Sequence, residues 1–242
     1  MTDTPLVSII LTLYKIDKTY LEECIDSLLN QTYSNIEILC MDDCSPDFTY
    51  EYLKDKSPKI RYYRNEVNLG MNKTVNKAFS LANGKYIVRL GSDDWFEKDL
   101  IEKEVTFLEN NSEYGAICCE LQKFGEYDNK IHRPYVWNYK EIIIKRRFGG
   151  TGYGGGMMFR KNLLEYCSID ESLKMCEDFD FHLQLLYRMP IGSLHEVLYH
   201  YRAHSNSICH SVKRDERLAL IEKIIEKHKK IYEEMFYFCS LR

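Results

Sequence analysis

The chain has 242 residues, of which 45% are hydrophobic and 29% are charged, and its formal net charge is −4. This length allows one large domain, or a domain with a small appendage, and either can bury a substantial core. A negative net charge argues against a protein that wraps nucleic acid, because such proteins usually carry a basic excess. We therefore expect an ordinary globular protein without a nucleic-acid partner.

The nine cysteines form no Cys-x-x-Cys pair and no cysteine–histidine cluster at zinc spacing. Reduced and mostly buried thiols are the expected state, which is typical of a cytoplasmic protein. The first five residues do not resemble a signal peptide, and no apolar run reaches the length that spans a membrane. The sequence predicts a cytoplasmic protein, either free in the cytoplasm or at the inner face of the membrane.

Strand and helix patterns alternate from the start of the chain. Residues 6–13 are almost wholly apolar, as expected of a parallel strand covered on both faces. Residues 19–22 have the form of a capping box, and a helix with regularly spaced apolar residues follows to about residue 29. A second strand, 36–41, runs directly into two aspartates.

The alternation continues to residue 119. The patterns predict a short helix at 48–54, a strand at 60–63, a helix at 71–82, a strand at 86–90, a helix from about 101 and a strand at 115–119. Strands and helices in turn predict an α/β fold, a doubly wound and mostly parallel sheet flanked by helices, as in a Rossmann fold.

The last predicted helix runs from about residue 213 to 236. Its apolar face is predicted to consist of Leu218, Ile221, Ile225, Tyr232 and Met235. The charges on this helix nearly balance, unlike those of a basic membrane-surface helix, so we expect it to pack on the main domain or against a second copy in a homodimer. His182 and His228 lie in helical patterns and are interpreted as packing residues.

The chain is therefore divided into a main domain, 1–210, with halves 1–96 and 97–210, and a C-terminal helical appendage, 211–242. The segment 142–148 joins apolar to basic residues and is the better candidate for peripheral membrane contact. A strand or helix end with a solvated basic tip is the favoured interpretation of this segment.

Three predicted strands end in polar or acidic residues. These ends carry Thr12 with Tyr14, Asp42 with Asp43, and Asp93 with Asp94. In doubly wound sheets, ligands bind outside the carboxyl ends of the strands. Adjacent carboxylates there repel each other and lose hydration, which is costly unless a cation is bound nearby. Although the first acidic pair also suits a turn, two such pairs at two strand ends favour a shared ligand site.

Several motifs, in this order, resemble those of family 2 glycosyltransferases. They are Val-Ser-Ile-Ile-Leu-Thr-Leu-Tyr at 7–14, Ser-Leu-Leu-Asn-Gln-Thr-Tyr at 27–33, Met-Asp-Asp-Cys-Ser at 41–45, Asn-Leu-Gly at 68–70 with Asn76, and Gly-Ser-Asp-Asp at 91–94. The resemblance covers roughly the first hundred residues, with the motifs in register. Two departures concern the nucleotide pocket: Thr12 replaces a frequent proline and Lys15 a common asparagine. Neither removes a catalytic group.

The resemblance implies an A-type glycosyltransferase fold and a nucleotide-sugar donor. Tyr14 would pack on the base beside Thr12, and Asp42 would accept the ring N–H of the base. A carboxylate can do this for uracil, thymine or guanine, but not for cytosine, whose N3 carries no hydrogen. Asn68 and Lys73 are further candidates for nucleotide binding.

The resemblance also assigns the second acidic pair. Asp93 would bind the ribose, and Asp94 would hold Mn²⁺ or Mg²⁺, since carboxylate and phosphate oxygens are hard ligands. The metal would neutralise charge on the leaving nucleoside diphosphate. Near the C-terminus, Arg202 or His204 would contact phosphate, and His204 is a further candidate metal ligand.

The second half is expected to supply the acceptor site and a base. The segment Met-Cys-Glu-Asp-Phe-Asp-Phe-His at 175–182 lies where the family carries an acidic pair with the catalytic base, which corresponds to Asp178. Glu177 and Asp180 remain alternatives, because acidic residues in a first helical turn often only interact with the helix dipole. The glycine-rich segment 148–157 lacks the ending of a P-loop and is predicted to border the site as a flexible segment.

The expected activity is inverting transfer of a single sugar from a UDP-sugar to a glycan or lipid-linked glycan, in bacterial-type glycan or polysaccharide assembly. The Gln-x-x-Arg-Trp motif of processive members is absent, which favours single addition. One alternative is a sugar-nucleotide pyrophosphorylase, but residues 12–17 lack its glycine-rich loop. The other is a catalytically silent nucleotide- or glycan-binding protein of the same fold, against which the retained aspartates argue.

Overall fold

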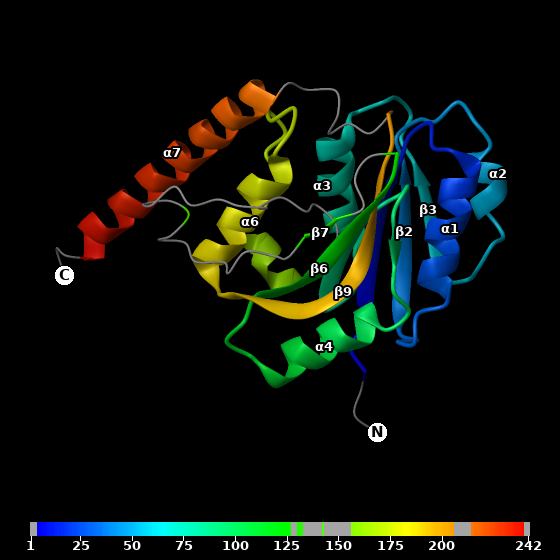
Figure 1. The fold of residues 1–242 in the computed structure, drawn as a ribbon, viewed down its shortest axis with the longest axis horizontal. Coiled ribbons are helices and arrows are strands. Elements are labelled where there is room, and N and C mark those ends of the chain that lie inside the picture. Colours follow the sequence, from blue (N-terminus) through cyan, green and yellow to red (C-terminus); the bar gives the residue numbers. More distant parts are fainter. Residues whose placement is uncertain (1–3, 127–129, 133–141, 143–155, 206–213, 240–242) are drawn as a thin grey trace.

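The computed structural model describes residues 4–126, 130–132, 142, 156–205 and 214–239. A single sheet occupies the centre, with helices on both of its faces (Figure 1). In this part of the chain the strand order is β3-β2-β1-β4-β8-β6-β9-β5, and β7 pairs with β6.

The first half builds the parallel side of the sheet. Its elements are β1 (Val7–Leu13), α1 (Lys18–Leu29), β2 (Ile36–Asp42), α2 (Thr49–Leu53), β3 (Ile60–Arg64), α3 (Met71–Leu81) and β4 (Tyr86–Gly91). β2 and β4 flank β1 in parallel, and β3 continues the sheet beyond β2. These elements follow the predicted ranges closely, because buried parallel strands have a clear apolar signature.

The second half adds the mixed side of the sheet. Its elements are β5 (Trp95–Phe96), α4 (Leu100–Asn110), β6 (Ala116–Gly125), β7 (Ile131–His132), β8 (Met157–Arg160), the 3-10 helix η1 (Lys161–Glu165), α6 (Glu177–Arg188), β9 (Ile191–Ala203) and α7 (Arg214–Cys239). β8 is antiparallel to both β4 and β6, while β9 runs parallel to β6. The predicted α/β class, with a mostly parallel sheet and a C-terminal helix, is confirmed.

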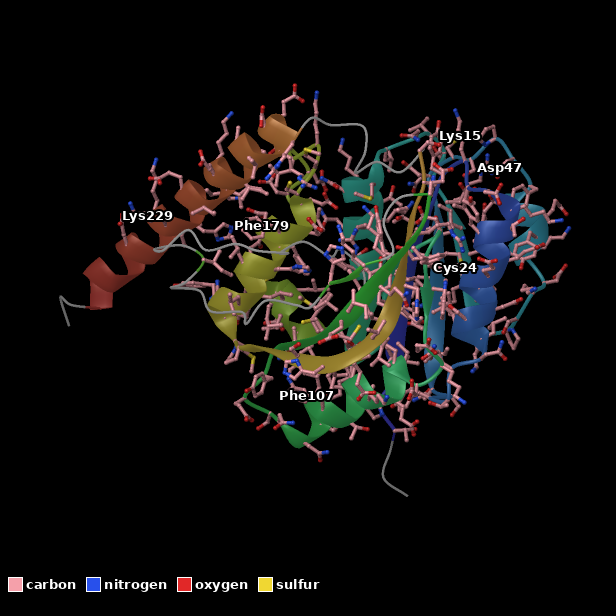
Figure 2. The ribbon with its side chains drawn as sticks, in the orientation of Figure 1. Lys15, Cys24, Asp47, Phe107, Phe179 and Lys229 are labelled. Carbon is pink, nitrogen blue, oxygen red and sulfur yellow. The ribbon has the colours of Figure 1, made fainter. Side chains whose placement is uncertain are left out.

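Two apolar layers hold the helices to the sheet. Alternate residues of β1 face opposite sides, so that Ile9 packs with α1 and α4 while Ile10 packs with α3 and α6. Cys24 of α1 lies in the first layer and Phe179 of α6 in the second (Figure 2). Burying one isoleucine side chain, such as that of Ile9 or Ile10, stabilises the fold by roughly 1.5–3 kcal/mol.

The start of α1 differs from its prediction. Asp17 is the N-cap, and its Oδ1 accepts hydrogen bonds from the backbone N–H groups of Thr19 at 2.8 Å and Tyr20 at 3.3 Å. The expected capping box at 19–22 is therefore wrong. An aspartate two residues earlier already satisfies the free N–H groups of the first turn.

The C-terminal helix α7 packs against α6 (Figure 1). Of the predicted face, Ile225 is buried and Ile221 packs against the core, whereas Leu218 is 37% exposed; Ile224 and His228 are also buried. The side chains of Tyr232 and Met235, residues 143–155 of the glycine-rich and basic segments, and the segment before α7 lie outside the described residues. No helix in the described ranges is long and apolar enough to cross a membrane.

Candidate active site

Three strand ends meet at one edge of the sheet. The pairing register places Leu13 of β1 opposite Asp42 of β2, and Thr12 opposite Gly91 of β4. The backbone N–H of Asp43 donates to the carbonyl of Leu13 at 2.9 Å. The polar residues that follow β1, β2 and β4 are therefore neighbours, as predicted from the order of the elements.

Asp42 lies at the bottom of this edge and is fully buried. Its Oδ1 accepts the N–H of Ser45 at 2.7 Å. Its Oδ2 accepts the hydroxyl of Tyr62 and the Nη1 of Arg64, the latter at 3.1 Å. The side chain of Arg64 is 42% exposed, so this guanidinium is the partner that can move aside when a ligand reaches Asp42.

Asp43 has a different task from its neighbour. Its Oδ1 accepts the N–H of Leu69 at 2.7 Å, and its Oδ2 accepts the N–H of Gly70 at 2.8 Å. Gly70 has φ of +86°, a left-handed conformation that favours glycine. Asp43 thereby holds the turn before α3, with Asn68 exposed on the turn and Lys73 exposed in the first turn of the helix. Sequence reasoning did not separate this structural role from that of Asp42.

Tyr14 follows β1 and is 46% exposed. The Nζ of Lys15 lies 5.1 Å from the centroid of its ring. Thr12 lies half-buried two residues before it, at the end of the strand. An exposed aromatic ring at the strand end can stack on a nucleotide base, which is the arrangement the sequence suggested.

The pair Asp93–Asp94 is divided by the fold. Asp94 is buried; its Oδ2 accepts the hydroxyl of Tyr199 and its Oδ1 accepts the N–H of Arg202 at 2.7 Å. Burial, reinforced by the charge of Asp93, raises the pKa of Asp94 well above its ordinary value. By contrast, Asp93 Oδ2 lies 2.9 Å from Nε2 of His204, and both side chains reach solvent.

This geometry adds a second candidate for the metal ligand beside Asp94. Asp94 was expected to be the metal ligand, yet both of its oxygens accept hydrogen bonds inside the protein. Asp93 and His204, which the sequence assigned to ribose and to a further ligand, form an ion pair whose side chains are 25% and 14% exposed. The difference between the two aspartates follows from β9, which packs Tyr199 and Arg202 onto Asp94.

The described residues do not supply a complete metal site. Among them there is no group of three or more histidine, cysteine, aspartate or glutamate side chains that could hold an ion. An ion that works on a nucleotide needs only one or two protein carboxylates, because phosphate oxygens complete its shell. The Asp93–His204 pair fits that smaller demand, and its nitrogen ligand favours Mn²⁺ over Mg²⁺.

Arg202 is held too firmly to be a free phosphate ligand. Its guanidinium pairs with Glu23 and lies over the rings of Tyr20, at 4.2 Å, and Phe124, at 4.7 Å. Its Nε donates to the carbonyl of Asp93 at 3.0 Å. Arg202 thus ties the end of β9 to α1 and to the acidic pair.

Asp178 stands in the first turn of α6. Its side chain is half-buried, and its Oδ1 accepts the N–H of Phe179 at 2.7 Å. Burial, together with the negative charge of Glu177, raises the pKa of Asp178 to about 7. An acid that titrates near neutral pH is suited to general-base catalysis.

Asp180 is occupied by a structural link between two helices. It is fully buried, and its Oδ1 accepts from Lys227 Nζ at 2.9 Å and lies 3.0 Å from Nε2 of His228. Burial opposes its charge, but the bonds from His228 and Lys227 lower its pKa overall. Asp180 is therefore a poor candidate for the base. The expectation that His228 only packs is wrong, because it binds this carboxylate.

Two asparagines of α3 clamp the segment that leads to α6. Asn76 donates through Nδ2 to the carbonyl of Ile169 at 2.9 Å and accepts the N–H of Ile169 at 3.0 Å. Asn72 donates to the carbonyl of Leu173 at 2.7 Å. The Asn76 motif noted in the sequence therefore connects the helix after the nucleotide edge to the helix that carries Asp178.

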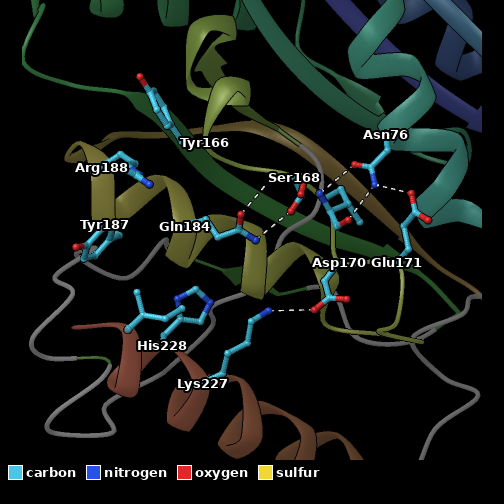
Figure 3. A pocket seen from close by; sticks show the side chains of 12 residues that line it. Asn76, Tyr166, Ser168, Asp170, Glu171, Gln184, Tyr187, Arg188, Lys227 and His228 are labelled. Carbon is cyan, nitrogen blue, oxygen red and sulfur yellow. Dashed lines mark hydrogen bonds and ion pairs between the residues drawn. The ribbon is translucent and has the colours of Figure 1, made fainter. Parts of the chain in front are cut away.

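A cavity of about 570 Å³ lies among α3, the segment 166–171, α6 and α7 (Figure 3). Its polar lining groups bond mainly to one another: Gln184 to Ser168, Asn76 to Glu171, and Lys227 to Asp170. Neither the strand-end acids nor Asp178 line it. This cavity is a polar seam between helices, separate from the candidate active site.

The sequence model of the family described as Glycosyl transferase family 2 matches residues 8–167. The chain belongs to glycosyl transferase family 2. EpsH of Bacillus subtilis, named as a glycosyltransferase, is 31% identical over an alignment of 223 positions, and the match covers 85% of this chain and 63% of EpsH. The chain thus spans less than two thirds of the length of this relative.

Two solved structures share the fold. The S. aureus TarS fragment 1–349, in complex with UDP-GlcNAc, superposes with a TM-score of 0.75 at 19% identity, covering 92% of this chain and 66% of that one. The mannosyltransferase PcManGT from Pyrobaculum calidifontis, in complex with GDP-Man and Mn²⁺, gives 0.65 at 17% identity, covering 85% and 59%. At these identities the likeness shows the A-type glycosyltransferase fold.

Proposed function

We propose that this protein transfers one sugar from a UDP-sugar to a hydroxyl group of a glycan or lipid-linked glycan, with inversion at the anomeric carbon. The observation that carries the proposal is the placement of Asp178, a partly accessible acid in the first turn of α6 whose pKa is raised by burial and by the charge of Glu177. The same chain brings a nucleotide-type edge together from β1, β2 and β4. Membership of the family and the UDP-GlcNAc named for TarS support this assignment.

The donor nucleotide would lie along the edge of the sheet. Tyr14 offers an exposed ring for the base, and Asp42 offers a carboxylate oxygen for its ring N–H once Arg64 moves aside. This pairing suits uracil. Asn68 and Lys73, exposed on either side of the turn before α3, would contact the ribose and diphosphate.

Asp93 and His204 would hold a divalent ion, with Mn²⁺ favoured. When bound, such an ion supplies positive charge for the leaving diphosphate. Asp94 would keep this pair in place through its bonds to Tyr199 and to Arg202 of β9. The Mn²⁺ named for PcManGT supports a metal requirement in this fold.

Asp178 would take the proton of the acceptor hydroxyl as that oxygen attacks from the face opposite the nucleotide. One base and one displacement need no covalent glycosyl intermediate, which is why the anomeric carbon inverts. The half-buried start of α6 limits access of water to this carboxylate. A cytoplasmic enzyme working on a lipid-linked acceptor would act at the inner face of the membrane.

The test of this proposal is the variant Asp178→Asn. The amide keeps the shape of the side chain but cannot take a proton at neutral pH, so transfer should fall roughly 10²–10⁴-fold. A thermal-shift panel of nucleotide-sugars identifies the donor, and transfer to a panel of lipid-linked glycans is then measured. UDP affinity and melting temperature should stay close to wild type. A silent binding protein would bind the nucleotide but show no transfer in either form.

A further inference from the structure

One arginine interrupts an apolar strand beneath the proposed base. The residues around it in β4 are buried and apolar, and Arg89 shares the face of Ile87, which packs in the same core as Phe179 of α6. The side chain of Arg89 is only 13% exposed. Burying a guanidinium is costly unless a carboxylate compensates its charge. The identity of that carboxylate therefore matters for the site.

The carboxylate is Glu177. Arg89 Nη2 lies 3.9 Å from Glu177 Oε1, whose side chain is itself only 10% exposed. The neighbouring Asp178 feels both charges: besides burial, Glu177 raises the pKa of Asp178 and Arg89 lowers it. His182, on the next turn of α6, adds no charge at neutral pH, because burial and then Arg89 lower its pKa to about 3.

We propose that Arg89 is a positioning residue for the acidic pair: its guanidinium binds Glu177 and leaves Asp178 as the carboxylate that meets the acceptor hydroxyl. The inference rests on the proposed role of Asp178. Glu177 is buried and Asp178 half-buried. Ionising both of these adjacent carboxylates is costly without a cation, and they would otherwise share a proton. A cation fixed on one side of the pair decides which member stays ionised. Glu177 is then a partner of the base and not a rival for its role.

The proton affinity of Asp178 can be measured without any acceptor. Carboxyl ¹³C signals of the full chain, labelled at the aspartate side chains, are followed against pH, and the signal absent from Asp178→Asn identifies the residue. In Arg89→Met the midpoint of Asp178 should rise by about 1–2 pH units, because the charge that lowers its pKa and compensates Glu177 is lost. In Arg89→Lys, which keeps the charge, it should stay within about half a unit of wild type.

Arg61→Met is the matched control. Arg61 is also a strand arginine paired with a glutamate, Glu37, but it lies on β3. This variant should leave the Asp178 midpoint unchanged even where it lowers the melting temperature. An effect equal to that of Arg89→Met would mean that loss of any buried ion pair disturbs α6, and the proposal would be wrong.

An unmoved midpoint in Arg89→Met overturns the inference. If Arg89→Met does not fold, Glu177→Gln is used in its place. Removing the negative neighbour should lower the titration midpoint of Asp178 by about one pH unit, and an unchanged midpoint in Glu177→Gln would also overturn the inference. Failure of the proposed function is a separate result. It would appear as full sugar transfer by Asp178→Asn, whatever the titration shows.

Discussion

Asp93 and Asp94 are adjacent in the chain, yet they stand in opposite surroundings. Asp94 is turned into the protein, where Tyr199 and the backbone of Arg202 bond to its two oxygens. Asp93 reaches solvent beside His204. Each carboxylate oxygen of Asp94 has a second lone pair, so these hydrogen bonds orient the side chain without excluding coordination. At the residue scale there are therefore two candidates for the metal ligand: Asp94, and Asp93 with His204.

The two aspartates can be separated by their effect on metal-assisted nucleotide binding. Asp93→Asn should remove most of the gain in UDP affinity that Mn²⁺ gives, since a direct ligand is lost. Asp94→Asn should weaken the gain by about tenfold or more, as supporting residues of metal sites do, but leave it detectable. Calorimetry of UDP with and without Mn²⁺ measures both. The reverse order of effects would return the ligand role to Asp94.

At the scale of elements, α3 and α6 act as a coupled pair. The N-terminus of α3 follows the turn that Asp43 holds, and its middle holds the segment before α6 through Asn76. The link Asp180–His228 then fastens α6 to α7. The helix that carries Asp178 is thus anchored on both sides by polar bonds, and apolar packing alone would not set its rotation so closely.

The clamp from Asn76 should be measurable as stability. Asn76→Ala removes the two side-chain hydrogen bonds to the backbone N–H and carbonyl of Ile169. This change should lower the free energy of unfolding by about 1–3 kcal/mol, because these partly buried backbone groups are left without a partner. Urea unfolding gives this value. Asn30→Ala, which removes a single exposed bond to the carbonyl of Asp26, is the matched control and should cost about 0.5 kcal/mol or less. Equal costs would show that the clamp is unimportant.

At the scale of the whole molecule, one buried acid does not belong to any site. Glu104 of α4 is fully buried, and among the described residues neither of its carboxylate oxygens has a hydrogen-bond partner. Burial raises the pKa of Glu104 well above its ordinary 4.5. A group whose pKa is higher in the folded state contributes stability at low pH, and this contribution is lost as pH rises through the folded value.

Glu104→Gln should therefore alter the pH dependence of stability. The amide cannot ionise, so the melting temperature of the variant should rise relative to that of the wild type as the pH increases from about 5 to 8. Glu102→Gln, an exposed change on the same helix, should run parallel to wild type. Thermal unfolding at several pH values tests this. A constant difference between Glu104→Gln and wild type would show that Glu104 does not titrate in this range.

The sequence by itself determined the class of fold, the order of the first elements and the edge where the acids gather. Buried parallel strands are nearly continuous apolar runs, and strand ends in such sheets meet on one side, so these features depend on local pattern. The acidic motifs also sufficed to indicate the family that the comparisons confirm.

Tertiary structure decided the surroundings and the hydrogen bonds of each acid. Asp42 differs from Asp43, Asp93 from Asp94, and Asp178 from Asp180 through partners far away in the chain, such as Tyr199, 105 residues after Asp94. The same holds for Arg89, whose charge meets Glu177 only when α6 packs on the sheet. The sequence shows which functional group a residue carries, but the exposure of that group and its hydrogen bonds depend on which distant element packs against it.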